Sequence, residues 1–89
     1  MIKYSQVSDV FQRNIGHNLC LLKNKDKFVY KLNKTSVFLW ELLQKPQSKE
    51  NLNKALSHKY KIPQSQAQKD IKDFLKYYLG DNLIKKVSD

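Results

Sequence analysis

Three short apolar segments separated by turn-forming residues occupy the first third of the chain, at residues 9–13, 19–23 and 27–32. Their lengths are typical of β-strands rather than of helices. Glycine and asparagine at residues 16–18, and asparagine and aspartate at residues 24–26, predict the two turns between them. Because such short connections reverse the chain direction, we expect an antiparallel three-stranded meander.

The third segment is the most strand-like, because it combines aromatic and β-branched residues. Side chains alternate along a strand, which places Phe28, Tyr30 and Leu32 on one face. Val29 and Lys31 then lie on the other face. The sequence therefore predicts a strand whose two faces differ in character.

The apolar spacing changes after this segment and predicts a helix over residues 33–44. Asn33 or Thr35 is expected to cap its start, and Pro46 is expected to end it. The positions that recur at i, i+3, i+4 and i+7 are Ser36, Leu39, Trp40 and Leu43.

Two more helices are predicted in the rest of the chain. One covers residues 48–60 and begins at a serine that is a good N-cap. The next begins between residues 63 and 66, where Ser65 and Gln68 match a capping box, and Gly80 is expected to stop it. Its wide apolar band consists of Ala67, Ile71, Phe74, Leu75, Tyr78 and Leu79.

The predicted order is three strands followed by three helices, with residues 82–87 as a short tail that packs back. An α+β fold of this kind covers one face of a small antiparallel sheet with helices. The order is like that of a winged helix-turn-helix. With 89 residues, the chain is expected to form a single domain over residues 1–89.

Residue types that carry chemistry are sparse. Cys20 is the only cysteine and lies in an apolar run, so we interpret it as a buried thiol that forms no internal disulfide. His17 and His58, the only histidines, have no Asp, Glu or Cys at metal-ligand spacing. The two glycines leave no room for a phosphate-binding loop. We therefore expect no enzyme activity, no metal site and no cofactor.

The hydropathy of the chain bears on its location. No apolar run approaches the roughly 18–20 residues of a membrane span, and residues 1–4 show no apolar signal segment. Together with the single cysteine, this predicts a cytoplasmic protein without a membrane partner.

The formal net charge of +9 indicates an acidic partner of some kind, or only a lysine-rich amino-acid usage. A winged-helix DNA-binding protein is one alternative, in which the third helix would read the duplex. That helix carries three lysines against two aspartates and no arginine, which disfavours contact with phosphates and guanine. These residues are Lys69, Lys72 and Lys76 with Asp70 and Asp73, which we interpret as helix-surface ion pairing.

Strand addition is the other mode of binding to consider. A three-stranded meander leaves two edges, and an edge strand offers N–H and C=O groups to an extended peptide. The lysines at the ends of residues 27–32 fit this function, and they equally fit protection of the edge against aggregation. The residues alone leave both readings open.

One pattern resembles the PqqD-like family over about residues 4–87. An aromatic strand that ends in Leu32-Asn33 is followed by a helix with Leu39-Trp40-Glu41-Leu42-Leu43, and then by Asp70 and Phe74-Leu75. Members of this family usually have a glycine directly before a final Leu-Leu or Leu-Ile pair. Here Gly80-Asp81-Asn82 precedes Leu83-Ile84, which leaves the geometry of the last turn open.

The resemblance implies a RiPP recognition element, a non-catalytic domain of peptide natural-product biosynthesis. Its members bind the leader of a precursor peptide as an added strand, between the third strand and the third helix. They deliver it to a modifying enzyme or leader peptidase in pathways to pyrroloquinoline quinone, lasso peptides or thioether peptides.

The resemblance also suggests which residues contact the leader. Lys31 and the lysines of the third helix are expected to meet acidic leader residues. Trp40 and Phe74 are interpreted as core, and Asp70 as an early residue that favours the helix dipole. The expected peptide-binding residues are Phe28, Val29, Tyr30, Lys31, Leu32, Lys69, Lys72, Leu75 and Lys76.

Overall fold

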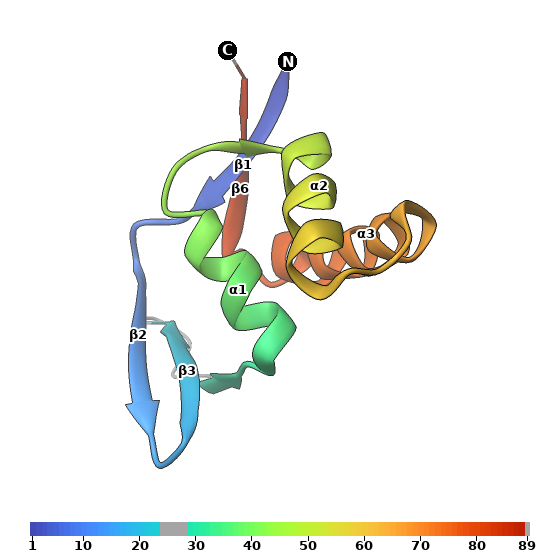
Figure 1. Cartoon of the computed structure of the whole chain (residues 1–89). Coiled ribbons are helices and arrows are strands. Elements are labelled where there is room, and N and C mark those ends of the chain that lie inside the picture. The colour runs from blue at the N-terminus through green and yellow to red at the C-terminus, as the bar shows by residue number, and fades with distance from the viewer. Residues whose placement is uncertain (24–28, 89) are drawn as a thin grey trace.

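The computed structural model describes residues 1–23 and 29–88, shown in Figure 1. Six strands and three helices lie in this part of the chain. In order they are β1 (Ile2–Gln6), β2 (Val10–Ile15), β3 (Asn18–Lys23), β4 (Val29–Lys31), α1 (Lys34–Leu42), β5 (Gln47–Ser48), α2 (Lys49–Tyr60), α3 (Gln64–Gly80) and β6 (Ile84–Ser88).

The predicted antiparallel meander is confirmed: it is the sheet with strand order β2-β3-β4. Gly16 makes the turn between β2 and β3 with a φ of +64°, a conformation that glycine adopts without steric cost. Leu21 pairs with Tyr30 and is fully buried against the helices. Together with the three helices, this sheet confirms the predicted α+β class.

A second three-stranded sheet, of order β5-β1-β6, was not predicted. β1 pairs with β6 along five residue pairs, from Ile2 with Ser88 to Gln6 with Ile84. Figure 1 shows these two strands side by side, with both chain termini at their far end. The tail that we expected to pack back is therefore a strand that joins the two ends of the chain.

The first two helices begin where side chains cap them. The Asn33 side chain accepts a hydrogen bond from the Ser36 amide at 2.8 Å, which selects Asn33 over Thr35 as the cap of α1. Ser48 caps α2 as predicted, through a bond of 3.1 Å from the Asn51 amide to its hydroxyl.

The predicted bounds of α3 are confirmed, since it begins at Gln64 and ends at Gly80, but the residues that form its two caps differ from those predicted. Pro63, which has no capping side chain, occupies the N-cap position, and Ser65 is already inside the helix. At the other end Gly80 is the last helical residue, and the left-handed residue is Asn82, with a φ of 58°. The Leu83 amide donates to the Tyr78 carbonyl at 2.9 Å and closes a Schellman turn.

Asn82 thus occupies the left-handed position in which a glycine is the usual residue. Asn82 lies directly before Leu83-Ile84, which is where the family that the sequence resembles usually has its glycine. The difference from the family pattern is therefore the replacement of glycine by Asn82, and both residue types tolerate a positive φ.

The core lies between the inner face of the meander and the three helices. Trp40 is 1% exposed, and its indole N–H donates to the Gln12 side chain of β2 at 2.9 Å. Phe74 is buried as well, so both residues belong to the core as predicted. Cys20 is buried, in agreement with its interpretation as a core thiol. The buried cluster comprises Leu21, Leu32, Leu39, Trp40, Leu43, Leu52, Leu56, Ala67, Ile71, Phe74, Leu75, Leu83 and Ile84.

Candidate functional site

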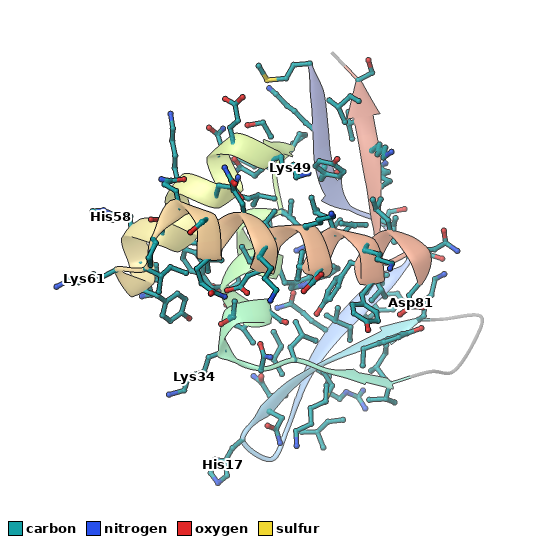
Figure 2. The ribbon with its side chains drawn as sticks, turned by 90° about the vertical axis from the view of Figure 1, so that its right-hand side faces the viewer. His17, Lys34, Lys49, His58, Lys61 and Asp81 are labelled. Atoms are coloured by element: carbon teal, nitrogen blue, oxygen red, sulfur yellow. The ribbon has the colours of Figure 1, made fainter. Side chains whose placement is uncertain are left out.

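A groove of about 640 Å³ lies between β4, the start of α1 and one side of α3. In Figure 2, α3 crosses the molecule on one side of the meander, and the labelled Asp81 marks the C-terminal end of this helix. The groove is lined by Val29, Tyr30, Lys31, Asn33, Thr35, Ser36, Leu39, Asp70, Asp73, Phe74, Tyr77, Tyr78, Asp81 and Leu83.

The strand wall of the groove is an edge strand, since β4 pairs with β3 and is the last strand of its sheet among the described residues. The Leu32 amide donates to the Leu19 carbonyl at 3.0 Å, which makes these two residues a hydrogen-bonded pair. Such pairs alternate along an antiparallel ladder. The backbone groups of Val29 and Lys31 therefore point away from β3, toward the groove.

The helix wall presents side chains spaced at i, i+3, i+4, i+7, i+8 and i+11, which is one face of α3. Phe74 and Tyr78 stack with ring centroids 3.9 Å apart and planes inclined by 25°. Together with Leu39 of α1 and Leu83 they give the groove an apolar floor. Tyr77, 70% exposed, stands at the rim.

Three carboxylates belong to the same wall: Asp70, Asp73 and Asp81. The Gln66 side chain donates to Asp70 Oδ1 at 2.9 Å and so orients this carboxylate. Lys31, on the opposite wall, is the only Lys or Arg among the lining residues in the described part of the chain. Acidic side chains therefore outnumber basic ones in the described lining of the groove, whereas the formal net charge of the chain is +9.

Tyr78 connects the apolar floor to the polar start of α1. Burial raises the pKa of its hydroxyl, and a side-chain hydrogen bond with Ser36 partly offsets this rise. The phenol is therefore neutral at physiological pH and contributes a polar tip to an otherwise apolar surface.

The predicted peptide-binding residues are only partly brought together. Val29, Tyr30 and Lys31 line the groove, whereas Leu32 is 4% exposed and packs in the core. Leu75 is 5% exposed and also belongs to the core. The predicted Phe28 lies outside the described residues.

The three predicted helix lysines do not line the groove. Lys69, Lys72 and Lys76 are exposed, and helical spacing puts them on the side of α3 that faces away from β4. Asp70 lies beyond the first turn of α3, so it is a groove residue rather than the early-turn residue that we expected.

Sequence reasoning missed Asp73, Tyr77 and Asp81, as well as the contribution of α1. Their helical positions could have identified these three residues, because they flank the apolar band of α3 on one side. We selected lysines for their charge, and charge does not indicate which flank of a helix faces a neighbouring strand.

The remaining candidate chemistry lies apart from the groove. Figure 2 shows His17 at the tip of the β2–β3 hairpin and His58 on α2, both pointing away from the body of the molecule. Among residues 1–23 and 29–88, no three His, Cys, Asp or Glu side chains are arranged to hold a metal ion. In the same ranges, no helix combines the length and apolar character needed to cross a bilayer.

Two solved structures share this fold. One is described as "TbiB1 in Complex with the TbiA(beta) Leader Peptide", with a TM-score of 0.81, 20% identity, and coverage of 96% of this chain and 99% of that chain. The other is "Lasso peptide synthetase B1 complexed with the leader peptide", with a TM-score of 0.80, 15% identity, and coverage of 92% and 96%.

The sequence itself matches a family profile over residues 19–84, which is most of the chain. That profile describes coenzyme PQQ synthesis protein D. A search of curated proteins gives no match. The matched segment begins in β3 and ends in β6, so it contains both walls of the groove. The chain therefore belongs to the PqqD family.

Proposed function

We propose that this chain is a RiPP recognition element, a non-catalytic protein that binds the leader of a precursor peptide. The leader adds to β4 as a further strand and occupies the groove between β4 and α3. The single observation that carries this proposal is the edge strand whose backbone groups face a helix across an open groove. Both solved neighbours of the same fold are complexes with leader peptides.

The backbone of β4 supplies the directional part of the interaction. Val29 and Lys31 each present an N–H and a C=O to the groove, so an extended peptide forms ladder bonds at every second residue. These bonds are independent of the leader's side chains. They fix its register and orientation.

The floor of the groove supplies most of the affinity. Leader side chains that point toward the core meet Leu39, Phe74 and Tyr78, which are apolar and already packed. Burial of a few apolar anchors commonly dominates the binding free energy of such interfaces. The leader thus needs apolar residues at alternate positions.

The bound leader would then be handed to a second protein, a modifying enzyme or a leader peptidase of the same pathway. The lasso peptide class is the first to test, because one structural neighbour is described as lasso peptide synthetase B1. DNA binding by α3 is not favoured, because the sequence matches the PqqD family and both solved neighbours are complexes with leader peptides.

The test is an NMR titration of the ¹⁵N-labelled chain with the leader of a precursor peptide encoded beside its gene. We expect the amide signals of residues 29–31 to shift together with those of residues 70–81. Signals of β2, which lies at the other edge of the meander, should stay in place. Binding that moves the β2 signals and leaves those of β4 unchanged would contradict the proposal.

A further inference from the structure

The described side chains that line the groove carry more negative than positive charges, whereas the whole chain has a formal net charge of +9. Three carboxylates line the α3 wall, at Asp70, Asp73 and Asp81, and Lys31 is the one Lys or Arg among the lining residues that the structure describes. Lys23 approaches this wall only at its end, where its Nζ donates to the Asp81 backbone carbonyl at 3.3 Å. The lysines of α3 lie on its other side and do not line the groove.

We propose that the leader segment bound between β4 and α3 is cationic, and that a lysine or arginine on its helix-facing side pairs with Asp73 and its neighbouring carboxylates. This inference rests on the proposed function, which it deepens by naming the class of peptide. It reverses the sign of partner that the net charge of +9 favours.

The spacing of the carboxylates fits an extended peptide. Asp70 and Asp81 are eleven residues apart on one helix face, a rise of roughly 16 Å at 1.5 Å per residue. An extended chain covers that length with about five residues at 3.3 Å each, and every second side chain points the same way. Two or three leader side chains therefore come within reach of the carboxylates.

Desolvation explains why these carboxylates select among peptides. An added strand removes water from the helix wall, and a carboxylate that loses water without gaining a cation or a donor destabilises the complex. An acidic leader side chain at the same place adds repulsion. The apolar floor accepts any leader with alternating apolar residues, so the carboxylates determine the sign of charge that is tolerated.

The experiment uses the full chain and a phage-displayed library of random dodecapeptides. Peptides selected on the wild-type chain should be enriched at least about threefold in Lys and Arg at one or more positions. Selection on the Asp73→Lys variant should reverse this enrichment toward Asp and Glu, and Asp73→Asn should reduce it without reversal. Asp9→Lys, which makes the same charge change in an exposed turn away from the groove, should select the wild-type pattern.

The outcomes separate this inference from the function on which it rests. Selected peptides that shift the amide signals of residues 29–31 without a basic preference, or with an acidic one, would overturn the inference and leave leader binding intact. Selected peptides that bind elsewhere on the chain would overturn both. An Asp9→Lys variant that reverses the preference like Asp73→Lys would show that net charge, rather than the groove, selects the peptide.

Discussion

Tyr30 and Lys31 are neighbours on β4, and the hydrogen-bond pattern gives them different tasks. The backbone of Tyr30 pairs with Leu21 of β3, and its side chain packs against the core. The backbone of Lys31 faces the groove, and its side chain is exposed. A contribution of Lys31 to peptide binding is therefore separable into a backbone part and a side-chain part.

Replacing Lys31 with proline tests the backbone part. Proline removes the N–H that faces the groove and leaves the ladder to β3 complete, a position that edge strands tolerate. Loss of one hydrogen bond of about 1 kcal/mol should weaken leader binding by roughly fivefold. Lys31→Ala, which keeps the N–H, should change the affinity less than Lys31→Pro in isothermal titration calorimetry. Equal losses in the two variants would place the interaction on the side chain instead.

Tyr78 gives a pH-dependent prediction at the same scale. Burial raises the pKa of its hydroxyl above the ordinary tyrosine value of 10.0, so this phenol ionises at lower pH in the unfolded chain than in the folded one. Its contribution to stability is complete below pH 10 and declines as pH rises through the folded pKa. Tyr78→Phe should therefore lose less stability than the wild type between pH 9 and pH 11, in urea unfolding experiments.

The matched control for this measurement is Tyr77→Phe, because Tyr77 is 70% exposed and has the same neighbours along the chain. The rest of the chain is the same in all three proteins, so only the difference in alkaline stability between variants is interpreted. A Tyr77→Phe variant whose alkaline loss is as small as that of Tyr78→Phe would contradict the assignment to the buried phenol.

At the scale of elements, the two ends of α3 show that a local sequence signal does not determine which residue caps a helix. The Ser65–Gln68 pattern and Gly80 are sound signals of a helix start and stop, and each is displaced by two residues or fewer. Pro63 fixes the start because its own φ of −61° suits the residue before a helix. The helix continues through Gly80 because Asn82 accepts the left-handed conformation.

Gly80→Ala tests whether Gly80 or Asn82 is the left-handed residue at the end of α3. Gly80 has no positive φ, and a β-carbon added there meets nothing within 4 Å. Alanine at a helical position should raise the free energy of unfolding by about 0.5–1 kcal/mol. Asn82→Ala should lower it by about 1 kcal/mol, because alanine is strained at a φ of 58°. If Gly80 were the left-handed stop, thermal denaturation would show Gly80→Ala as the destabilised variant.

At the scale of the whole molecule, the elements that the sequence did not predict are strands that pair between distant segments of the chain. The meander and the helices follow from local periodicity and turns, which one segment displays by itself. β1 and β6 pair across most of the chain length, and β5 is two residues long. In β1 the apolar Ile2 is exposed and the polar Ser5 is buried, and β6 has consecutive lysines at Lys85 and Lys86, so the apolar pattern of neither strand marks the face that packs on the core.

The β1–β6 pairing also helps to hold in place a residue that lines the groove. Ile84, the first residue of β6, is buried in the core, and Leu83, directly before it, lines the groove. The Val7 amide donates to the Leu83 carbonyl at 3.1 Å, which makes this a hydrogen-bonded pair. By alternation the backbone of Lys85 points toward β1, whereas that of Lys86 points outward.

Lys85 and Lys86 therefore form a matched pair for proline substitution, since both side chains are exposed and both lie in β6. Lys85→Pro removes a ladder bond and should lower the free energy of unfolding by about 2–3 kcal/mol, whereas Lys86→Pro at the open edge should cost less than about 1 kcal/mol. Because Leu83 connects β6 to the groove floor, Lys85→Pro should also weaken leader binding at temperatures where the variant remains folded. Urea unfolding and calorimetric titration measure the two effects. Equal stability of the two variants would mean that the pairing of the chain ends contributes nothing to the fold, and that the groove floor is held by α3 and its Schellman turn alone.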